Sequence, residues 1–174
     1  MNRLVYVGQV VLDLSKHLMY DFWYNNINAK YDNTAQLLYT DTDSLIMEVE
    51  TPDIYVDMWA DKDNYDLSDC PKGHQYHDDM HRKVIGKLKN ETCGIPLAEV
   101  IALRAKMYSI EKSDLSNIGR AKGVSRTVVK KDFTHELHKC SLLDRKELIH
   151  TQVNIRSVAH QIGVYEQNKS LPTR

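Results

Sequence analysis

Hydrophobic residues near the start of the chain recur with the period of an α-helix. Intervals of three or four residues separate Val7, Val11, Leu14, Leu18 and Phe22. Such intervals place side chains on one stripe of a helix, so the pattern predicts a helix over residues 7–27. The segment that follows, residues 25–33, is rich in Asn and Asp, which favour turns and would end the helix.

Two β-prone runs come next and flank an acidic tripeptide. The runs are residues 36–40 and 44–49, and Asp41-Thr42-Asp43 separates them. This arrangement predicts a β-hairpin with carboxylates at its tip. Because side chains alternate along a strand, an extended tripeptide would project Asp41 and Asp43 to the same side.

Downstream, residues 51–79 are acidic and predict a short helix with a long loop, and residues 83–89 and 96–111 predict two strands. The second strand has a period of two. One of its faces would carry Ile101, Leu103, Ala105 and Met107. The other face would carry Ala102, Arg104, Lys106 and Tyr108. We expect the first face to pack and the second to meet solvent or a ligand.

The last third of the chain predicts a second lobe. Residues 112–123 are polar with two glycines and predict a linker between lobes. A strand should follow, and then a short helix begun by Thr134, whose hydroxyl can cap free backbone amides. Residues 151–165 predict further strands. Together these elements indicate an α+β fold.

Length and composition indicate a soluble protein with an uneven charge. In its 174 residues no apolar run approaches the roughly 20 residues that span a bilayer, and the start lacks a signal-peptide layout. We therefore expect an intracellular protein with no membrane partner. Three widely spaced cysteines argue against a disulfide framework. Residues 1–79 carry 5 Lys and Arg against 15 Asp and Glu, and residues 80–174 carry 18 against 9. The basic half suits a polyanion such as nucleic acid.

The acidic tripeptide predicts a metal site. Two neighbouring carboxylates repel each other, and a divalent cation offsets their charge. Carboxylate oxygens favour Mg²⁺, Mn²⁺ or Ca²⁺ over softer metals. An EF-hand is excluded, because the sixth loop position is Ile46 where glycine is needed. Two alternatives stay open: ordinary turn chemistry, and a metal-dependent glycosyltransferase, since those enzymes also use an Asp-x-Asp pair.

Histidines and cysteines supply a second candidate metal set. Zinc ligands by residue type are Cys70, His74, His77 and His81. No Cys-x-x-Cys pair accompanies them, and the sequence leaves open whether they bind metal. A weaker set has only three members, His135, His138 and Cys140.

The residues around the acidic pair carry a more specific signal. Tyr39-Thr40-Asp41-Thr42-Asp43-Ser44 resembles the third palm motif of family-B DNA polymerases, Tyr-x-Asp-Thr-Asp-Ser. Residues 4–25 resemble the helix that leads into that hairpin in protein-primed members, notably those of large self-replicating transposons and related viruses. Lys106-Met107-Tyr108 resembles the Lys-x-Tyr strand of the family. Residues 120–134 and 154–171 are similar to the opening and closing segments of the thumb.

The resemblance implies a DNA-directed DNA polymerase, which transfers a nucleotidyl group from a dNTP to a primer 3′ oxygen with the help of two Mg²⁺ ions. It implies that Asp43 is a direct metal ligand and Asp41 a supporting one, with Mn²⁺ as a substitute metal. The residues implied at the primer end are Tyr39, Lys106 and Tyr108. Those implied along the duplex backbone are Lys122, Gly123, Arg126, Lys130 and Lys131.

Two family motifs do not occur in this chain: the Asp-x-x-Ser-Leu-Tyr-Pro segment of the palm and the fingers motif that grips the triphosphate. The resemblance therefore implies the C-terminal part of a polymerase. Residues 1–115 would form an antiparallel palm sheet with packed helices, and residues 116–174 a small β-rich thumb. Implied partners are primer-template DNA, a dNTP, the missing N-terminal part with its exonuclease, and a terminal protein as candidate primer. We expect this fragment alone to be inactive. A non-catalytic nucleic-acid-binding module remains a third alternative.

Overall fold

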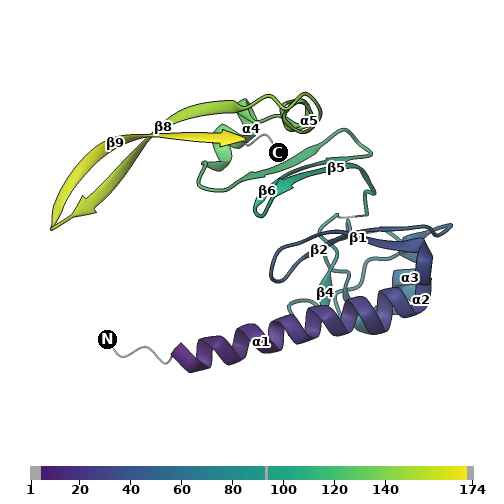
Figure 1. The fold of residues 1–174 in the computed structure, drawn as a ribbon. Coiled ribbons are helices and arrows are strands. Elements are labelled where there is room, and N and C mark those ends of the chain that lie inside the picture. Colours follow the sequence, from purple (N-terminus) through teal and green to yellow (C-terminus); the bar gives the residue numbers. More distant parts are fainter. Residues whose placement is uncertain (1–4, 93, 172–174) are drawn as a thin grey trace. The chain divides into compact units, whose positions relative to one another are not determined.

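The computed structural model describes residues 5–92 and 94–171 and has a mixed α+β fold, as the sequence predicted (Figure 1). Contacts divide the chain into two compact units, Met1–Gly94 and Ile95–Arg174. We call them the N-terminal unit and the C-terminal unit. Among the described residues, no helix combines the length and hydrophobicity that a membrane span requires.

A long helical segment opens the N-terminal unit. Helix α1, Val5–Asp21, continues into a π-helical stretch, Phe22–Asn28, and then into α2, Ala29–Tyr31. The helix predicted over residues 7–27 is therefore present and extends a little further. It ends where Asp32 adopts a φ of 46°, outside the helical range.

Four of the five residues of the predicted hydrophobic stripe are exposed, and only Phe22 is buried. The exposed fractions range from 37% to 65% for Val7, Val11, Leu14 and Leu18. Burial is concentrated near the C-terminal end, at Met19, Phe22 and Ile27. The rings of Phe22 and Tyr65 also pack edge to face, with their centroids 5.6 Å apart. The last turns thus anchor the helix, because apolar area is removed from water mainly there.

Strands β1, Ala35–Thr40, and β2, Leu45–Val49, form the predicted antiparallel hairpin. Half-buried and exposed residues alternate along β1, as expected for a strand with one covered face. The register shifts between Leu37 and Tyr39, which marks a β-bulge shortly before the tip.

Helix α3, Ile54–Ala60, is the short helix predicted within residues 51–79. It begins at Asp53, whose carboxylate accepts a hydrogen bond from the backbone N–H of Tyr55 at 2.8 Å. A side-chain oxygen at this position satisfies one of the free amides of the first turn.

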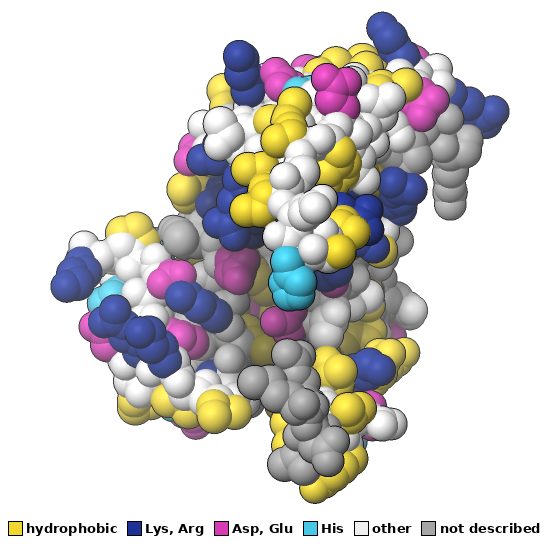
Figure 2. Space-filling model, turned by 90° about the vertical axis from the view of Figure 1, so that its left-hand side faces the viewer, with side chains coloured by type: hydrophobic (Ala, Val, Ile, Leu, Met, Phe, Trp, Pro, Cys, Tyr) yellow, Lys and Arg dark blue, Asp and Glu magenta, His cyan; other side chains and the backbone are white. Residues whose placement is uncertain are grey.

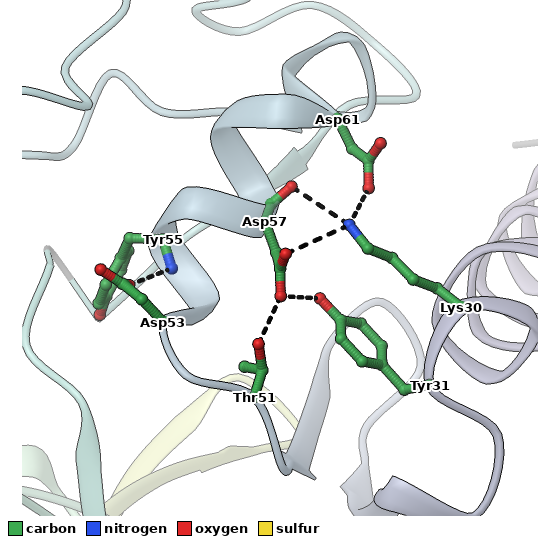
Figure 3. Close-up of polar contacts among 7 residues, drawn as sticks. All are labelled: Lys30, Tyr31, Thr51, Asp53, Tyr55, Asp57 and Asp61. Atoms are coloured by element: carbon green, nitrogen blue, oxygen red, sulfur yellow. Dashed lines mark hydrogen bonds and ion pairs between the residues drawn. The ribbon is translucent and has the colours of Figure 1, made fainter.

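A polar cluster fastens α3 to the end of the preceding helical segment (Figure 3). The Asp57 carboxylate accepts hydrogen bonds from the hydroxyl of Thr51 at 2.6 Å and from that of Tyr31 at 2.8 Å. The Lys30 ammonium lies 2.6 Å from the Asp61 carboxylate and 3.8 Å from that of Asp57. The hydrogen bonds of Thr51 and Tyr31, with the nearby Lys30 charge, lower the pKa of Asp57. Burial and the hydrogen bond to Asp57 raise the pKa of Tyr31.

The rest of the N-terminal unit is mostly loop. Strands β3, Tyr65–Asp66, and β4, Leu88–Lys89, pair in parallel. The strand predicted over residues 83–89 is reduced to β4, because consecutive backbone turns occupy the preceding residues. Burial, with the charges of Asp61 and Asp57, raises the pKa of Tyr65 to about 12.

A three-stranded antiparallel sheet forms the base of the C-terminal unit. Its strands are β5, Leu97–Arg104, β6, Met107–Lys112, and β7, Asn117–Ala121, in the order β5-β6-β7. The linker predicted over residues 112–123 therefore contains a strand. The predicted boundary after residue 115 falls between β6 and β7, whereas the compact units divide between Gly94 and Ile95.

Two short helices follow the sheet. Helix α4, Arg126–Asp132, replaces the predicted strand; the Ser125 hydroxyl caps it by accepting a hydrogen bond from the backbone N–H of Val128. Helix α5, His135–Leu143, begins after Thr134, which caps it as predicted. The core of the unit joins residues of β6, β7, α4, the turn after α4 and the last strand: Met107, Ala121, Val129, Phe133 and Leu171.

A partly buried polar network holds α5 against β5 and β6. His135, 3% exposed, places Nδ1 3.0 Å from the Ser109 hydroxyl and Nε2 3.2 Å from the Glu99 carboxylate. The Lys139 ammonium donates to the same carboxylate at 2.9 Å. Hydrogen bonds from Lys139 and then His135 lower the pKa of Glu99. Burial lowers the pKa of the neighbouring His138.

The chain ends in a long β-ribbon, which confirms strands over residues 151–165. Strand β8, Leu148–Val158, pairs antiparallel with β9, Gln161–Leu171, over their whole length. Ala159 and His160 form the turn between them, both with positive φ. The ribbon runs away from α4 and α5 (Figure 1).

Candidate functional site

The acidic hairpin tip is built from a strand end and a tight turn. Thr40 and Leu45 form the last pair of the β1–β2 ladder, so Asp41, Thr42, Asp43 and Ser44 make up the connection. Within it, the Asp43 N–H donates to the Asp41 carbonyl at 2.6 Å. A hydrogen bond from residue i+2 to residue i defines a γ-turn, here centred on Thr42 at a φ of 56°.

This turn corrects the predicted extended geometry. The chain reverses at Thr42, so strand alternation does not decide where the two carboxylates point. The Asp41 carbonyl also accepts hydrogen bonds from the Ser44 N–H at 3.2 Å and the Ser44 hydroxyl at 3.3 Å. A β-branched residue with positive φ is rare, because its Cβ crowds the backbone. The tip is thus tightly closed around Asp41, at the expense of strain at Thr42.

The tip offers oxygen ligands from two carboxylates. Asp41 is half-buried and Asp43 is exposed. Within the described ranges 5–92 and 94–171, no group of three or more His, Cys, Asp and Glu residues could hold a metal ion. Mg²⁺ is usually bound by one or two protein carboxylates, with water and substrate phosphates completing its shell. The donor chemistry of Asp41 and Asp43 therefore fits Mg²⁺ as a partial site.

Tyr39 lies one residue before the end of β1 and is half-buried. It pairs with Ile46 across the hairpin, directly after the β-bulge. Burial still alternates through this bulge, with Leu37 and Tyr39 both half-buried, and β-bulges are common next to functional sites. Tyr39 and the acidic pair are therefore brought together on one hairpin, as the sequence predicted.

The Lys-x-Tyr segment differs from its prediction. Instead of one strand over residues 96–111, Ala105 and Lys106 form the turn of the β5–β6 hairpin, and Lys106 has a φ of 60°. Lys106 is exposed at this turn, whereas Tyr108 is half-buried in the central strand, opposite Arg120. The two side chains therefore do not share one strand face. They belong to the C-terminal unit, and the acidic tip belongs to the N-terminal unit.

Lys122 and Gly123 lie in the turn that joins β7 to α4. Both are exposed, and Gly123 has a φ of 79°, where glycine is favoured over other residues. A Cβ at this position would lie 2.8 Å from the Lys169 ammonium. The Gly123 carbonyl accepts a hydrogen bond from the Gln152 side chain at 2.8 Å. Gly123 thus allows the ribbon to pack closely against this turn.

The remaining predicted DNA-binding residues lie on α4 rather than on a strand. Arg126, Lys130 and Lys131 are all exposed. Arg126 and Lys130 are four positions apart, so they share a helix face. Lys130 and Lys131 occupy the last turn, where cations also favour the helix dipole. Their clustering therefore has a structural reason besides any contact with a polyanion.

The ribbon adds Lys169, which is absent from the predicted DNA-binding residues. Lys169 pairs with His150 across the ribbon and lies against Gly123. The sequence carries a signal for it: in a strand over residues 161–171, Gln167 and Lys169 are two positions apart and so lie on the same face. Lys122, Gly123 and Lys169 thus form one basic corner of the C-terminal unit.

The candidate zinc residues make other contacts. Nδ1 of His77 lies 2.8 Å from the Cys70 carbonyl, and Nδ1 of His81 lies 3.1 Å from the carbonyls of Lys62 and Tyr65. These ring nitrogens thus bond to backbone oxygens. The weaker set is also divided, because His135 joins the Ser109 network described above. Neither set forms a group of three ligands in the described part of the chain.

Comparison with protein families, with curated proteins and with solved structures found no match for this chain.

Proposed function

We propose that this chain forms the catalytic hairpin and DNA-binding end of a family-B DNA-directed DNA polymerase. The observation that carries the proposal is the six-residue motif Tyr39–Ser44 at the tip of an antiparallel hairpin. A long helix, α1 with its extension, precedes that hairpin. Ordinary turn chemistry requires neither the tyrosine nor this order of elements.

The reaction would join a deoxynucleotide to a primer end. The primer 3′ hydroxyl gives its proton to water, and its oxygen attacks the α-phosphorus of the dNTP to form a phosphodiester bond. The bond from the α-phosphorus to the oxygen that bridges to the β-phosphate breaks, and pyrophosphate leaves with its electrons. Divalent cations, when bound, would neutralise negative charge on the reacting oxygens. In this chain Asp43 would hold the cation directly, and Asp41 would support it.

The tight turn at Thr42 supports this division of roles. Asp41 is half-buried and its backbone carbonyl accepts three hydrogen bonds, whereas Asp43 is exposed. A group held in one orientation loses less freedom when a ligand binds. Asp41 would therefore set the orientation of the tip, and Asp43 would meet the ion and the triphosphate.

The C-terminal unit would hold the duplex. It carries 14 Lys and Arg against 8 Asp and Glu, whereas the N-terminal unit carries 9 against 16. Lys122, Arg126, Lys130 and Lys131 are exposed and would contact phosphates without reading sequence. This charge division also favours the second candidate function, a DNA-binding module that performs no chemistry.

A complete polymerase site needs more than this chain supplies. The tip supplies two carboxylates, and the sequence contains no motif that would grip the triphosphate. The site therefore depends on a further polypeptide. We therefore include the N-terminal polymerase part as a partner, alongside primer-template DNA and a dNTP, and keep a terminal protein as candidate primer.

Metal binding tests the proposed role of Asp43. Calorimetric titration with Mn²⁺ or Mg²⁺ should show weak binding to the parent chain, because two carboxylates supply only part of the ligands that these ions need. Asp43→Ala should abolish that binding. The matched control is Glu48→Gln, which removes an exposed carboxylate from β2 of the same hairpin and should leave binding intact. Equal binding by the parent and Asp43→Ala would refute the assignment.

Primer extension separates the polymerase from a simple DNA-binding module. The chain alone should bind primer-template DNA and incorporate no nucleotide, and extension should appear only with the complementing N-terminal part. Asp43→Ala should then abolish incorporation while DNA binding persists. If incorporation survives this substitution, the polymerase mechanism proposed for the tip is wrong.

A further inference from the structure

The β8–β9 ribbon has two faces of different chemistry. Cross-strand pairing places residues of both strands on the same side: Ile155 lies opposite Val164, and Ser157 lies opposite Ile162. One face therefore carries an aliphatic set with exposed fractions of 62–79%: Ile149, Val153, Ile155, Ile162 and Val164. We call this set the aliphatic face.

The other face is polar and contacts the rest of the C-terminal unit. Across from each other on it lie His150 and Lys169, and further along Gln152 and Gln167. Gln152 donates to the Gly123 carbonyl at 2.8 Å. Leu171, at the base of the same face, is fully buried in the core. Beyond its apolar base, the face turned to the rest of the unit thus carries mainly polar side chains, whereas the aliphatic face is open to water.

The outer half of the ribbon has no cover within the described chain. Every residue from Ile155 to Glu166 is exposed. Hydrophobic side chains (yellow) are open to the surface on the side toward which the ribbon extends (Figure 2). A two-stranded ribbon is only marginally stable in water without further strands or a packed face. A partner that covers the aliphatic face would therefore stabilise the ribbon.

We propose that two copies of this chain associate through the aliphatic face of β8–β9. The two ribbons would pack face to face as a small two-layer sandwich, with Ile155 and Val164 of one copy against the same residues of the other. Each copy would present the same patch, as a two-fold interface requires. Aligned sheets pack at an angle of about −30°, so two ribbons of this length can overlap along most of the face.

Charge selects this occupant over a polyanion. The aliphatic face carries one charged residue, Glu166, and no Lys or Arg. A nucleic acid would therefore gain nothing from counterion release on this face. Two copies can approach each other there because the two pairs of this face nearest the ribbon turn, Ile155–Val164 and Ser157–Ile162, are uncharged. Glu166 lies opposite Val153, one pair further from the turn, and its long side chain can extend past the edge of the narrow ribbon to remain in water.

The available area also fits a pair of copies. The five side chains expose on the order of 600 Å² per copy, so a pair would bury on the order of 1,200 Å², the lower end for a specific interface. The face is too small for an obligate dimer of several thousand Å². We therefore expect a reversible dimer in the micromolar range, which needs neither metal nor DNA.

Sedimentation equilibrium of the full chain tests the proposal. The parent should change from mainly monomer to mainly dimer as its concentration rises toward about 200 μM, as expected for a dissociation constant in the micromolar range. Ile155→Lys with Val164→Lys should weaken dimerisation at least tenfold, because two buried ammonium groups per copy would be unpaired. The matched control, Asn154→Lys with Gln161→Lys, adds the same charge to the polar face and should leave the dimer intact.

A second variant guards against loss of folding. Ile155→Thr with Val164→Thr keeps β-branched side chains and strand propensity but removes apolar area, so the circular dichroism spectrum should be unchanged while the dimer weakens. A parent that stays monomeric, or a dimer that survives the lysine and threonine pairs, would overturn the proposal. So would a control pair that disrupts the dimer as strongly as the aliphatic substitutions. The measurement requires no activity, so its failure leaves the polymerase proposal untouched.

Discussion

Several residues of this chain adopt a backbone conformation that glycine would adopt more easily. Thr42 at the acidic tip, Lys106 at the β5–β6 turn, and Ala159 with His160 at the ribbon turn all have positive φ. Each closes a hairpin connection without glycine or asparagine. Left-handed backbone costs an L-residue roughly 1–2 kcal/mol, so these turns are held by the strand pairing on either side.

The ribbon turn provides a test at the scale of single residues. A two-residue connection with positive φ at both positions favours Asn-Gly, whereas this chain has Ala159-His160. Replacing Ala159 by Asn and His160 by Gly should raise the free energy of unfolding by about 1 kcal/mol, because both new residues tolerate the conformation. Urea unfolding at a fixed protein concentration measures this gain. Ala159→Val serves as the opposite control and should destabilise the chain.

The same absence of turn residues explains one failure of the sequence reasoning. Ala105 and Lys106 interrupt the period-two pattern of residues 96–111 with no glycine, proline or asparagine to mark a turn. The pattern therefore predicted one strand and placed Lys106 and Tyr108 on one face. At the acidic tip, by contrast, Asp41-Thr42-Asp43 separates two clear β-prone runs, and the hairpin was predicted correctly. The γ-turn inside it depends on backbone angles that the residue types do not reveal.

At the scale of elements, the long patterns at the start and the end of the chain predict the right type of element, whereas local propensity predicts the wrong one for α4. The helix at the start and the strands of the ribbon have long regular patterns and are present. The segment Thr127-Val128-Val129 favours a strand by propensity, yet it forms helix α4. The Ser125 cap and the burial of Val129 outweigh that propensity, because tertiary contacts routinely do so.

The cluster around Asp57 makes the link between α2 and α3 sensitive to acid. Hydrogen bonds from Thr51 and Tyr31, with the Lys30 charge, lower the pKa of Asp57 below its ordinary value of 3.8. The unfolded chain therefore binds a proton at a higher pH than the folded chain does. The stabilisation is complete above about pH 4 and is lost as the pH falls through the folded-state pKa.

Asp57→Asn tests this link. At pH 7 the variant should be less stable than the parent by about 1–3 kcal/mol, because its amide accepts weaker hydrogen bonds than a carboxylate. The difference should shrink as the pH falls below about 4, where the parent carboxylate becomes protonated. Urea unfolding of both proteins between pH 7 and pH 2.5 measures the difference. If the difference in free energy of unfolding between the two proteins stays constant with pH, the charge of Asp57 does not contribute to stability.

At the scale of the whole molecule, charge divides with the fold. The N-terminal unit, with the carboxylate tip, has a net charge of −7, and the C-terminal unit has a net charge of +6. The charge imbalance was evident from the sequence alone. The boundary between the two units is not evident from the sequence, because residues 112–123, which contain β7, predict a linker. Charge counts are independent of strand pairing, whereas a domain boundary depends on which strands pair.

The charge division predicts how DNA binding responds to salt. If Lys130 and Lys131 each contact a phosphate, replacing both by Ala should lower the slope of log affinity against log salt by about 2. The loss of affinity should be similar for all DNA sequences, because phosphate contacts carry no sequence information. The control replaces Lys16 and Lys72 of the N-terminal unit by Ala and should leave the slope unchanged. An unchanged slope in the α4 variant would place the duplex elsewhere.

The unbroken pairing of β8 and β9 has a consequence for how this chain can vary. Side chains change sides at every position, so deleting a single residue from β9 would move each following residue to the opposite side. Asn168 or Ser170 would then take the side that Lys169 occupies beside Gly123, and Gln167 would move to the aliphatic face. Selection should therefore conserve the length of this segment even where its residues are free to change.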